Sequence, residues 1–100
     1  MATTSKALVR TPATTSNTIL YTVPVGTTTI VTNIVIANTN GSAQTATISL
    51  DGVVLIPAVS VPANTVVPID IKQTITSGVK IEGFASSTAV TFHISGVEVN

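Results

Sequence analysis

The 100-residue sequence contains no cysteine, so no disulfide holds its fold together. Charge is nearly absent as well: four basic and four acidic residues leave a formal net charge of zero. Aromatic side chains number three, and tryptophan is missing. Without a basic patch to neutralise phosphates, or aromatic rings to stack on bases, the composition argues against nucleic-acid binding.

The same scarcity excludes the usual catalytic and metal-binding arrangements. His93 is the single histidine, and no carboxylate stands at a spacing that would orient it as a general base. One histidine and four scattered carboxylates supply no ligand set for a metal ion, and no glycine-rich loop opens a helix to hold a phosphate. We therefore expect no enzyme activity, no cofactor and no metal, and we interpret His93 as a surface or interface residue.

Long apolar runs are missing too. The longest, Val53 to Val59, is interrupted by Pro57 and is far shorter than the roughly 20 residues that a membrane-spanning helix needs. The first ten residues, MATTSKALVR, contain no apolar segment of the kind found in secretory signals. We expect neither a secretory signal nor association with a membrane.

What the sequence does contain is β-branched residues, since Thr, Val and Ile make up 45 of the 100. These side chains fit a pleated sheet better than a helix, so the fold class is all-β. The longest such run is Thr27–Asn38, and turn residues close it on both sides. We expect it to be the central strand, covered from both sides or by a partner on one side. Its predicted faces are Ile30, Ile34 and Ile36 with Thr32, and Val31, Val35 and Ala37 interrupted by Asn33.

Shorter runs with alternating apolar residues predict the remaining strands, about eight in all. Asp51-Gly52 is a strong signal for a two-residue hairpin turn, whereas Pro57 is expected to end the strand that follows it. Pro68 suggests an edge strand, residues 72–78 a connection with a helical turn, and Gly96 a bulge in the last strand. The predicted strands are 18–23, 44–50, 53–56, 59–61, 65–71, 79–83 and 89–99.

This pattern predicts a single β-sandwich of about eight antiparallel strands, jelly-roll or immunoglobulin-like, over residues 18–100. Strand order is not readable from the sequence. Residues 1–17 are rich in Thr, Ser and Ala, and they predict a flexible N-terminal arm or an edge strand over Ala7–Arg10.

A domain with so little charge and so many Val and Ile residues is expected to have part of its surface covered by another protein. The alternative is that the nineteen threonines solvate the surface. In the hairpin register around Asp51-Gly52, Val54 and Ile56 fall on the face opposite the core. The candidate interface residues are Val54, Ile56 and Val66 in the domain, and Leu8, Val9 and Arg10 in the arm.

Two segments resemble a group of small bacteriophage virion proteins. They are LYTVPVGTTTIVTNIVIAN (20–38) and FHISGVEV (92–99). Members of that group carry Y-x-V-P, a Gly/Thr turn and a long strand that ends in Asn, and their last strand ends in S-G-x-E. The resemblance implies a non-enzymatic virion structural protein, foremost a capsid decoration (cement) protein and next a tail, neck or collar component.

The resemblance also implies the partners. They are copies of the chain itself, with a trimer favoured, and the major capsid protein or another virion protein; the location is the virion, assembled in the host cytoplasm. We expect the arm to grip the shell or a neighbouring copy, so that a chain lacking residues 2–16 folds but loses particle binding. The alternative function is a carbohydrate- or host-surface-binding β-sandwich module, although such sites depend on exposed aromatic residues.

Overall fold

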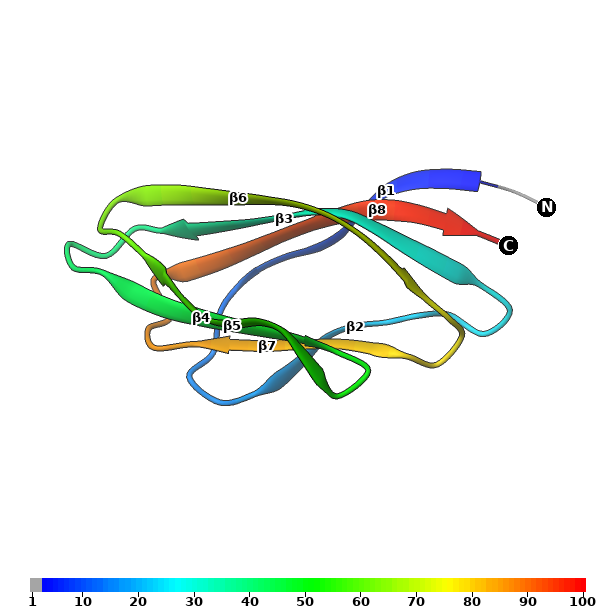
Figure 1. Cartoon of the computed structure of the whole chain (residues 1–100), viewed down its shortest axis with the longest axis horizontal. Coiled ribbons are helices and arrows are strands. Elements are labelled where there is room, and N and C mark those ends of the chain that lie inside the picture. Colours follow the sequence, from blue (N-terminus) through cyan, green and yellow to red (C-terminus); the bar gives the residue numbers. More distant parts are fainter. Residues whose placement is uncertain (1–2) are drawn as a thin grey trace.

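A computed structural model describes residues 3–100 as two four-stranded sheets packed face to face (Figure 1). Sheet A has the strand order β1-β8-β3-β6, sheet B has the order β2-β7-β4-β5, and all neighbouring strands are antiparallel. The strands are β1 (Thr3–Pro12), β2 (Thr18–Thr22), β3 (Thr28–Asn38), β4 (Gln44–Leu50), β5 (Val53–Val61), β6 (Thr65–Ile75), β7 (Lys80–Ala85) and β8 (Val90–Val99).

This strand order is that of a jelly roll. The chain crosses between the sheets at every connection except the β4–β5 hairpin, which stays within sheet B. The all-β prediction is confirmed, and of the two architectures left open by the sequence, the strand order selects the jelly roll rather than the immunoglobulin-like sandwich. The predicted central strand is also confirmed, since β3 pairs with both β6 and β8.

The core lies between the inner faces of the two sheets. Phe92 and Ile94 of β8 and Ile34 and Ile36 of β3 are fully buried there, and Ile48 of β4 meets them from sheet B. The alternation that predicted strands over residues 44–50 and 89–99 is thus confirmed. With a single aromatic ring at its centre, this core is made almost entirely of Ile and Val, whose stiff side chains favour the strand conformation.

A row of extra residues crosses sheet A and corrects the predicted faces of β3. Leu8 on β1 and Thr32 on β3 are each one residue more than β8 supplies, so the pairing shifts on both sides of β8, at positions one residue apart along this strand. Because a bulge reverses the alternation of side chains, Val31 shares the inner face with Ile34, and Ile30 turns outward. The bulge predicted at Gly96 therefore lies on the two neighbouring strands.

Gly96 itself lies where the backbone of β3 passes close to that of β8. A Cβ atom added there would lie 2.3 Å from the carbonyl oxygen of Ile30 and 3.0 Å from Leu8 Cδ1. Only glycine leaves room for the backbone of β3 at this level, so the bulged register depends on it.

The hairpin prediction holds at its tip and fails further along. Leu50 pairs with Val53, and Asp51 and Gly52 both have positive φ, as the two-residue turn requires. Beyond the tip, Ile48 pairs with Ile56 instead of Leu55 because the register shifts. Ile56 is turned into the core by this shift.

Two further predictions are wrong about where strands end. The strand expected to stop at Pro57 continues to Val61, because β5 is an edge strand and takes Pro57 and the positive-φ Ala58 into an irregular stretch. Of the connection with a helical turn expected over residues 72–78, residues 72–75 are instead the end of β6, which runs to Ile75, and the connection is shorter. The edge position predicted from Pro68 is confirmed.

Of the two expectations for the N-terminal stretch, the structure shows the edge strand. Residues 1 and 2 lie outside the described residues, and Thr3–Pro12 pairs with β8 along its whole length. Val9 and Ala13 are buried in the common core. This stretch is therefore part of the sandwich, and the strand is longer than the predicted Ala7–Arg10.

Asn38 joins the two connections at one end of the sandwich. Its Nδ2 donates hydrogen bonds to the carbonyl oxygens of Ser42, Val61 and Pro62 at 3.0–3.3 Å, and its Oδ1 accepts one from the backbone N–H of Asn40 at 2.9 Å. The side chain is buried with both of its polar atoms bonded. Asn38, the last residue of β3, thus holds the β3–β4 and β5–β6 connections together.

Candidate interaction surface

Each of the four sheet edges carries a feature that hinders pairing with another strand. β1 has the bulge at Leu8, and β2 is only five residues long. β5 contains Pro57 beside the positive-φ Ala58, and β6 contains Pro68. Prolines, bulges and short lengths are the usual means by which sandwiches avoid edge-to-edge association. Contacts with another protein are therefore expected to use side chains.

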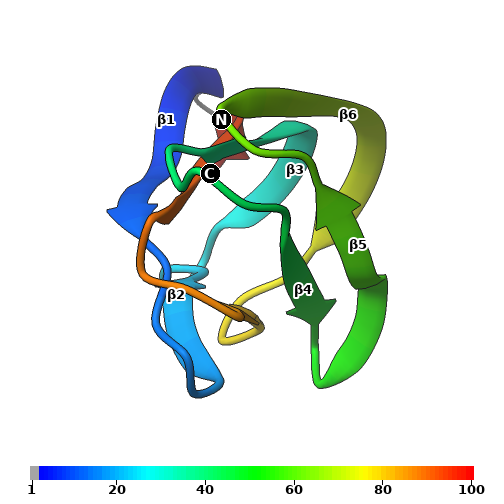
Figure 2. The same ribbon diagram turned by 90° about the vertical axis from the view of Figure 1, so that its left-hand side faces the viewer.

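The sandwich has two open sides, where the edges of the two sheets face one another (Figure 2). On one side β1 of sheet A lies over β2 of sheet B. On the opposite side β6 of sheet A lies over β5 of sheet B. We call these the β1–β2 side and the β5–β6 side.

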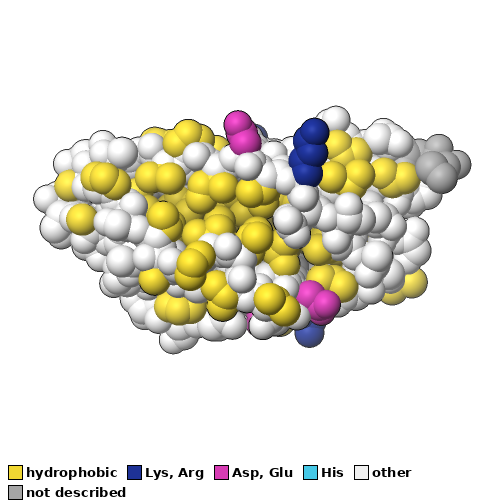
Figure 3. Space-filling model, viewed as in Figure 1, with side chains coloured by type: hydrophobic (Ala, Val, Ile, Leu, Met, Phe, Trp, Pro, Cys, Tyr) yellow, Lys and Arg dark blue, Asp and Glu magenta, His cyan; other side chains and the backbone are white. Residues whose placement is uncertain are grey.

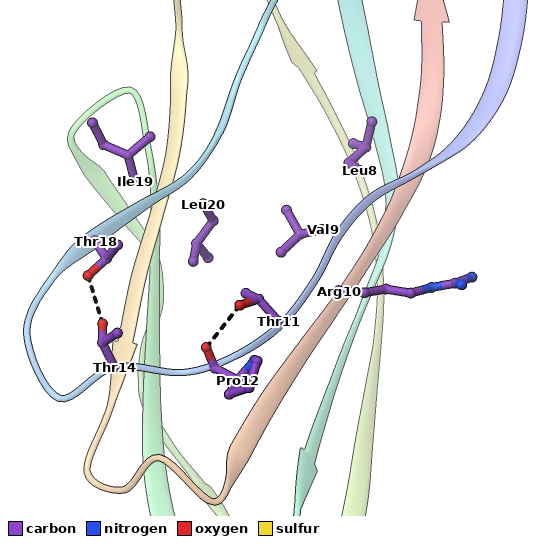
Figure 4. Close-up of a pocket in the computed structure, with 9 residues that line it drawn as sticks. All are labelled: Leu8, Val9, Arg10, Thr11, Pro12, Thr14, Thr18, Ile19 and Leu20. Atoms are coloured by element: carbon purple, nitrogen blue, oxygen red, sulfur yellow. Dashed lines mark hydrogen bonds between the residues drawn. The ribbon is translucent and has the colours of Figure 1, made fainter.

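The β1–β2 side contains a cavity of about 250 Å³ (Figure 4). Val9 of β1 and Leu20 of β2 point toward each other across it, and Thr14 and Thr18 are joined by a hydroxyl–hydroxyl hydrogen bond of 2.7 Å at its rim. The Arg10 side chain points away from the cavity toward solvent. This side therefore has an apolar floor, hydroxyls at its rim and the exposed guanidinium of Arg10 beside it.

The β5–β6 side is the more apolar of the two. Apolar side chains gather along the middle of this face, between the two edge strands (Figure 3). Val54 on β5 and Val66 on β6 are both 55% exposed, and a half-buried row lies between them and the core. The row consists of Leu55, Val59, Val67, Ile69 and Ile71. A contiguous apolar face of this kind favours contact with another protein.

The register connects the two open sides. In sheet B, Ile19, Glu82, Ser49 and Val54 lie in one row across the four strands, so Ile19 and Val54 mark its two ends. In sheet A, the row Arg10, His93, Val35 and Pro68 runs from β1 to β6. Asp70 lies two residues beyond Pro68, on the same outer face. Arg10 and Asp70 thus lie at opposite edges of sheet A, two residues apart in level, and Ile19 and Val54 lie at the two ends of one row in sheet B.

The six predicted interface residues fall on these two sides, three on each. Val54 and Val66 are exposed on the β5–β6 side, but Ile56 is only 5% exposed, because the shifted register turns it inward. On β1, Arg10 is exposed, Leu8 is half-buried and Val9 is 5% exposed. Ile56 and Val9 are therefore core residues.

Two exposed residues of this surface, Ile19 and Asp70, were not predicted as candidates from the sequence. Strict alternation along residues 18–23 would place Ile19 on the same face as Tyr21, but Leu20 is an extra residue in the pairing of β2 with β7, and Ile19 is 51% exposed. Asp70 was noted only as one of the scattered charges. Neither had a sequence signal, since bulge positions and strand order decide where both residues lie.

A polar cluster ties the two sheets together near the ends of β2 and β8. Tyr21 Oη donates a hydrogen bond to Glu98 Oε2 and lies 3.1 Å from Thr29 Oγ1, and Lys6 Nζ lies 3.2 Å from Glu98 Oε1. The hydrogen bonds from Tyr21 and Lys6 hold the pKa of the Glu98 carboxyl below its usual value. Burial, together with the bond to Glu98, raises the pKa of Tyr21.

Glu98→Gln is expected to lower the free energy of unfolding by about 1 to 3 kcal/mol at pH 7, the worth of hydrogen bonds to a charged group. Because the pKa of Glu98 is lowered in the folded state, its stabilisation is present above the usual glutamate pKa and is lost as the pH falls through the lowered value. Urea unfolding of both proteins at pH 7 and at pH 3 checks this. The difference should shrink at pH 3, and Tyr21→Phe should show a similar loss at pH 7. An equal difference at both pH values would contradict this role of Glu98.

The remaining chemistry-bearing residues are dispersed. His93 is exposed on the outer face of sheet A, as predicted, with its Nε2 3.5 Å from Thr91 Oγ1. Within residues 3–100, no three His, Cys, Asp or Glu side chains gather closely enough to hold a metal ion. Over the same residues there is no helix that is long and apolar enough to cross a membrane.

No protein-family model matches the sequence, and no curated protein is significantly similar to it. Among solved structures, an exo-β-1,3-galactanase from Phanerochaete chrysosporium resembles the chain with a TM-score of 0.43 and 20% identity, over 97% of this chain and 29% of the enzyme. A pentameric capsid protein isolated from metagenomic phage sequences gives a TM-score of 0.40 and 16% identity, over 90% of this chain and 60% of the other. The chain thus spans less than two thirds of either protein, and likeness at this level assigns no function.

Proposed function

We propose that the chain is a non-enzymatic structural protein of a virion and works by packing against copies of itself and against another virion protein. The observation that carries this proposal is the pair of uncovered apolar sides on a sandwich whose strand edges are all hindered from pairing. The segments 20–38 and 92–99, which resemble small phage virion proteins, form the central strand β3 and its neighbour β8. The protein acts in the virion, after assembly in the host cytoplasm.

Within the virion, a capsid decoration protein is the role that we favour. A small domain with few charges makes weak contacts one at a time, but a homo-oligomer that binds through several of them gains avidity from an assembled shell. A trimer is the oligomer that we favour. The partner on the shell is the major capsid protein, and in the tail, neck or collar alternative it is another virion protein. β1 takes part through Leu8 and Arg10 on the surface of the sandwich.

Peptide mass spectrometry of purified particles tests this assignment. We expect the chain in many copies per particle, and immunogold labelling should place it over the capsid surface. Label confined to the tail or neck would select the alternative position. Absence of the chain from particles that carry all other virion proteins would contradict a structural role.

The carbohydrate-binding alternative depends on an exposed aromatic platform. Phe92 is buried, Tyr21 is engaged by Glu98, and Phe84 is half-buried. Within residues 3–100, Phe84 is therefore the one ring left to stack on a sugar face, and a single half-buried ring makes no platform. Binding to a glycan array that is abolished by Phe84→Ala would overturn this conclusion.

A further inference from the structure

We propose that copies of this chain associate head to tail, with the β1–β2 side of one copy packed against the β5–β6 side of the next. The proposal deepens the proposed function by naming a second copy as the partner and two opposite sides as the contact.

The first complementary pair consists of two opposite charges on sheet A. Arg10 on β1 and Asp70 on β6 are exposed on the outer face of sheet A, and neither has an ion-pair partner within residues 3–100, where Lys6 and Glu98 form the one salt bridge. They stand at opposite edges, at levels that differ by two residues along the strand, which is about 7 Å. An arginine side chain covers that length. When the β1 edge of one copy lies beside the β6 edge of the next, the two unpaired charges meet.

A second complementary pair lies on sheet B. Ile19 and Val54 end a single row across this sheet, and both are more than half exposed. In a side-by-side arrangement that brings Arg10 next to Asp70, the β2 edge of one copy also lies beside the β5 edge of its neighbour. Ile19 then covers Val54, so each sheet contributes one complementary pair to the same contact.

Shape agrees with this arrangement. The β1–β2 side is hollowed by the cavity of about 250 Å³ between Val9 and Leu20, whereas the β5–β6 side presents the half-buried apolar row between its two strands (Figures 3 and 4). Because the two complementary sides lie on opposite flanks of one molecule, the contact is heterologous and closes into a ring when the rotation between copies allows it.

A symmetric contact between two β1–β2 sides is disfavoured on the same grounds. Neither β1 nor β2 carries a carboxylate, so two such sides packed together leave both copies of Arg10 without an opposite charge from these strands. Lys72, two residues beyond Asp70, makes no ion pair within residues 3–100 and adds a positive charge to the β6 edge. The charge reversal at Asp70 must therefore be compared with a charge reversal on an interior strand, away from both edge strands.

Charge reversal tests the pairing. Arg10→Asp and Asp70→Arg should each weaken self-association, measured by sedimentation velocity of the full chain, by more than about tenfold. The double variant R10D/D70R carries exchanged charges on both sides, so it should recover the oligomer. Lys80→Asp, on the interior strand β7, is the matched control and should leave the mass unchanged. Circular dichroism confirms that each variant is folded.

A mixing experiment tests the head-to-tail geometry. Ile19→Asp blocks one side and Val54→Asp blocks the other, so each variant alone should be a monomer. Mixed in equal amounts, they retain one intact contact and should form a 1:1 pair that grows no further. A folded D70R variant that keeps the wild-type mass, a folded double variant that stays dissociated, or a mixture that gives no pair would overturn the proposal. So would a wild-type chain that is still a monomer at about 1 mM. These experiments use the purified chain alone, so their failure leaves the virion assignment to the particle analysis.

Discussion

Gly96→Ala is expected to lower the free energy of unfolding by about 3 kcal/mol or to prevent folding, because it forces a side chain against the backbone of the neighbouring strand β3. The added Cβ would lie 2.3 Å from the carbonyl oxygen of Ile30, a contact that no rotation relieves, and 3.0 Å from Leu8 Cδ1. To make room, β3 or β8 must move, and both carry fully buried core residues. Urea unfolding followed by circular dichroism measures the loss.

Gly41→Ala is the matched control for this effect. A Cβ added at Gly41 meets no atom within 4 Å, and this glycine does not have positive φ. Its substitution should change the free energy of unfolding by no more than about 0.5 kcal/mol. Equal effects at the two positions would mean that the close approach at Gly96 does not hold the bulged register in place.

Removing residues 2–12 is expected to abolish cooperative folding. The deletion removes β1 and turns β8 into an unprotected edge of sheet A. It also removes the buried side chain of Val9 from the core. Since a domain of this size is stable by only about 5 to 15 kcal/mol, the loss of one of eight strands exceeds what it tolerates. A truncated chain that is aggregated, or that lacks a thermal transition, would match this expectation.

A shorter truncation separates the strand from its first residues. Among the residues that the structure describes, removing residues 2–5 takes away only the exposed side chains of Thr3, Thr4 and Ser5. The thermal transition should therefore persist, with a modest decrease in its midpoint temperature. If the chain without residues 2–12 melts like the full chain, β1 acts as the dispensable arm expected from composition. Particle binding by such a folded truncation would then test the gripping role directly.

The sequence predicted the features that depend on local chemistry. Asp51-Gly52 supplies the positive φ that its turn needs, and the alternation in Gln44–Leu50 and around Phe92 identifies the buried faces. Those predictions are confirmed because turn geometry and period-two burial act over a few residues. Pro68 marked an edge for the same local reason.

Bulges and strand order explain what the sequence did not show. Thr32 and Leu20 lie in apolar or β-branched runs and carry no mark of an extra residue, yet each reverses the faces of the residues beside it. The inward turn of Ile56 and the exposure of Ile19 follow from such shifts. That Arg10 and Asp70 stand at opposite edges of one sheet depends on long-range pairing, which no short sequence pattern encodes.

The central claim, that this jelly roll works by packing against copies of itself, is tested most directly by its solution mass. Light scattering of the purified chain at a low and a high concentration distinguishes the two outcomes. We predict a mass several times the 10.1 kDa of one chain, with a closed oligomer giving the same value at both concentrations. A mass of 10.1 kDa at both concentrations would contradict the account.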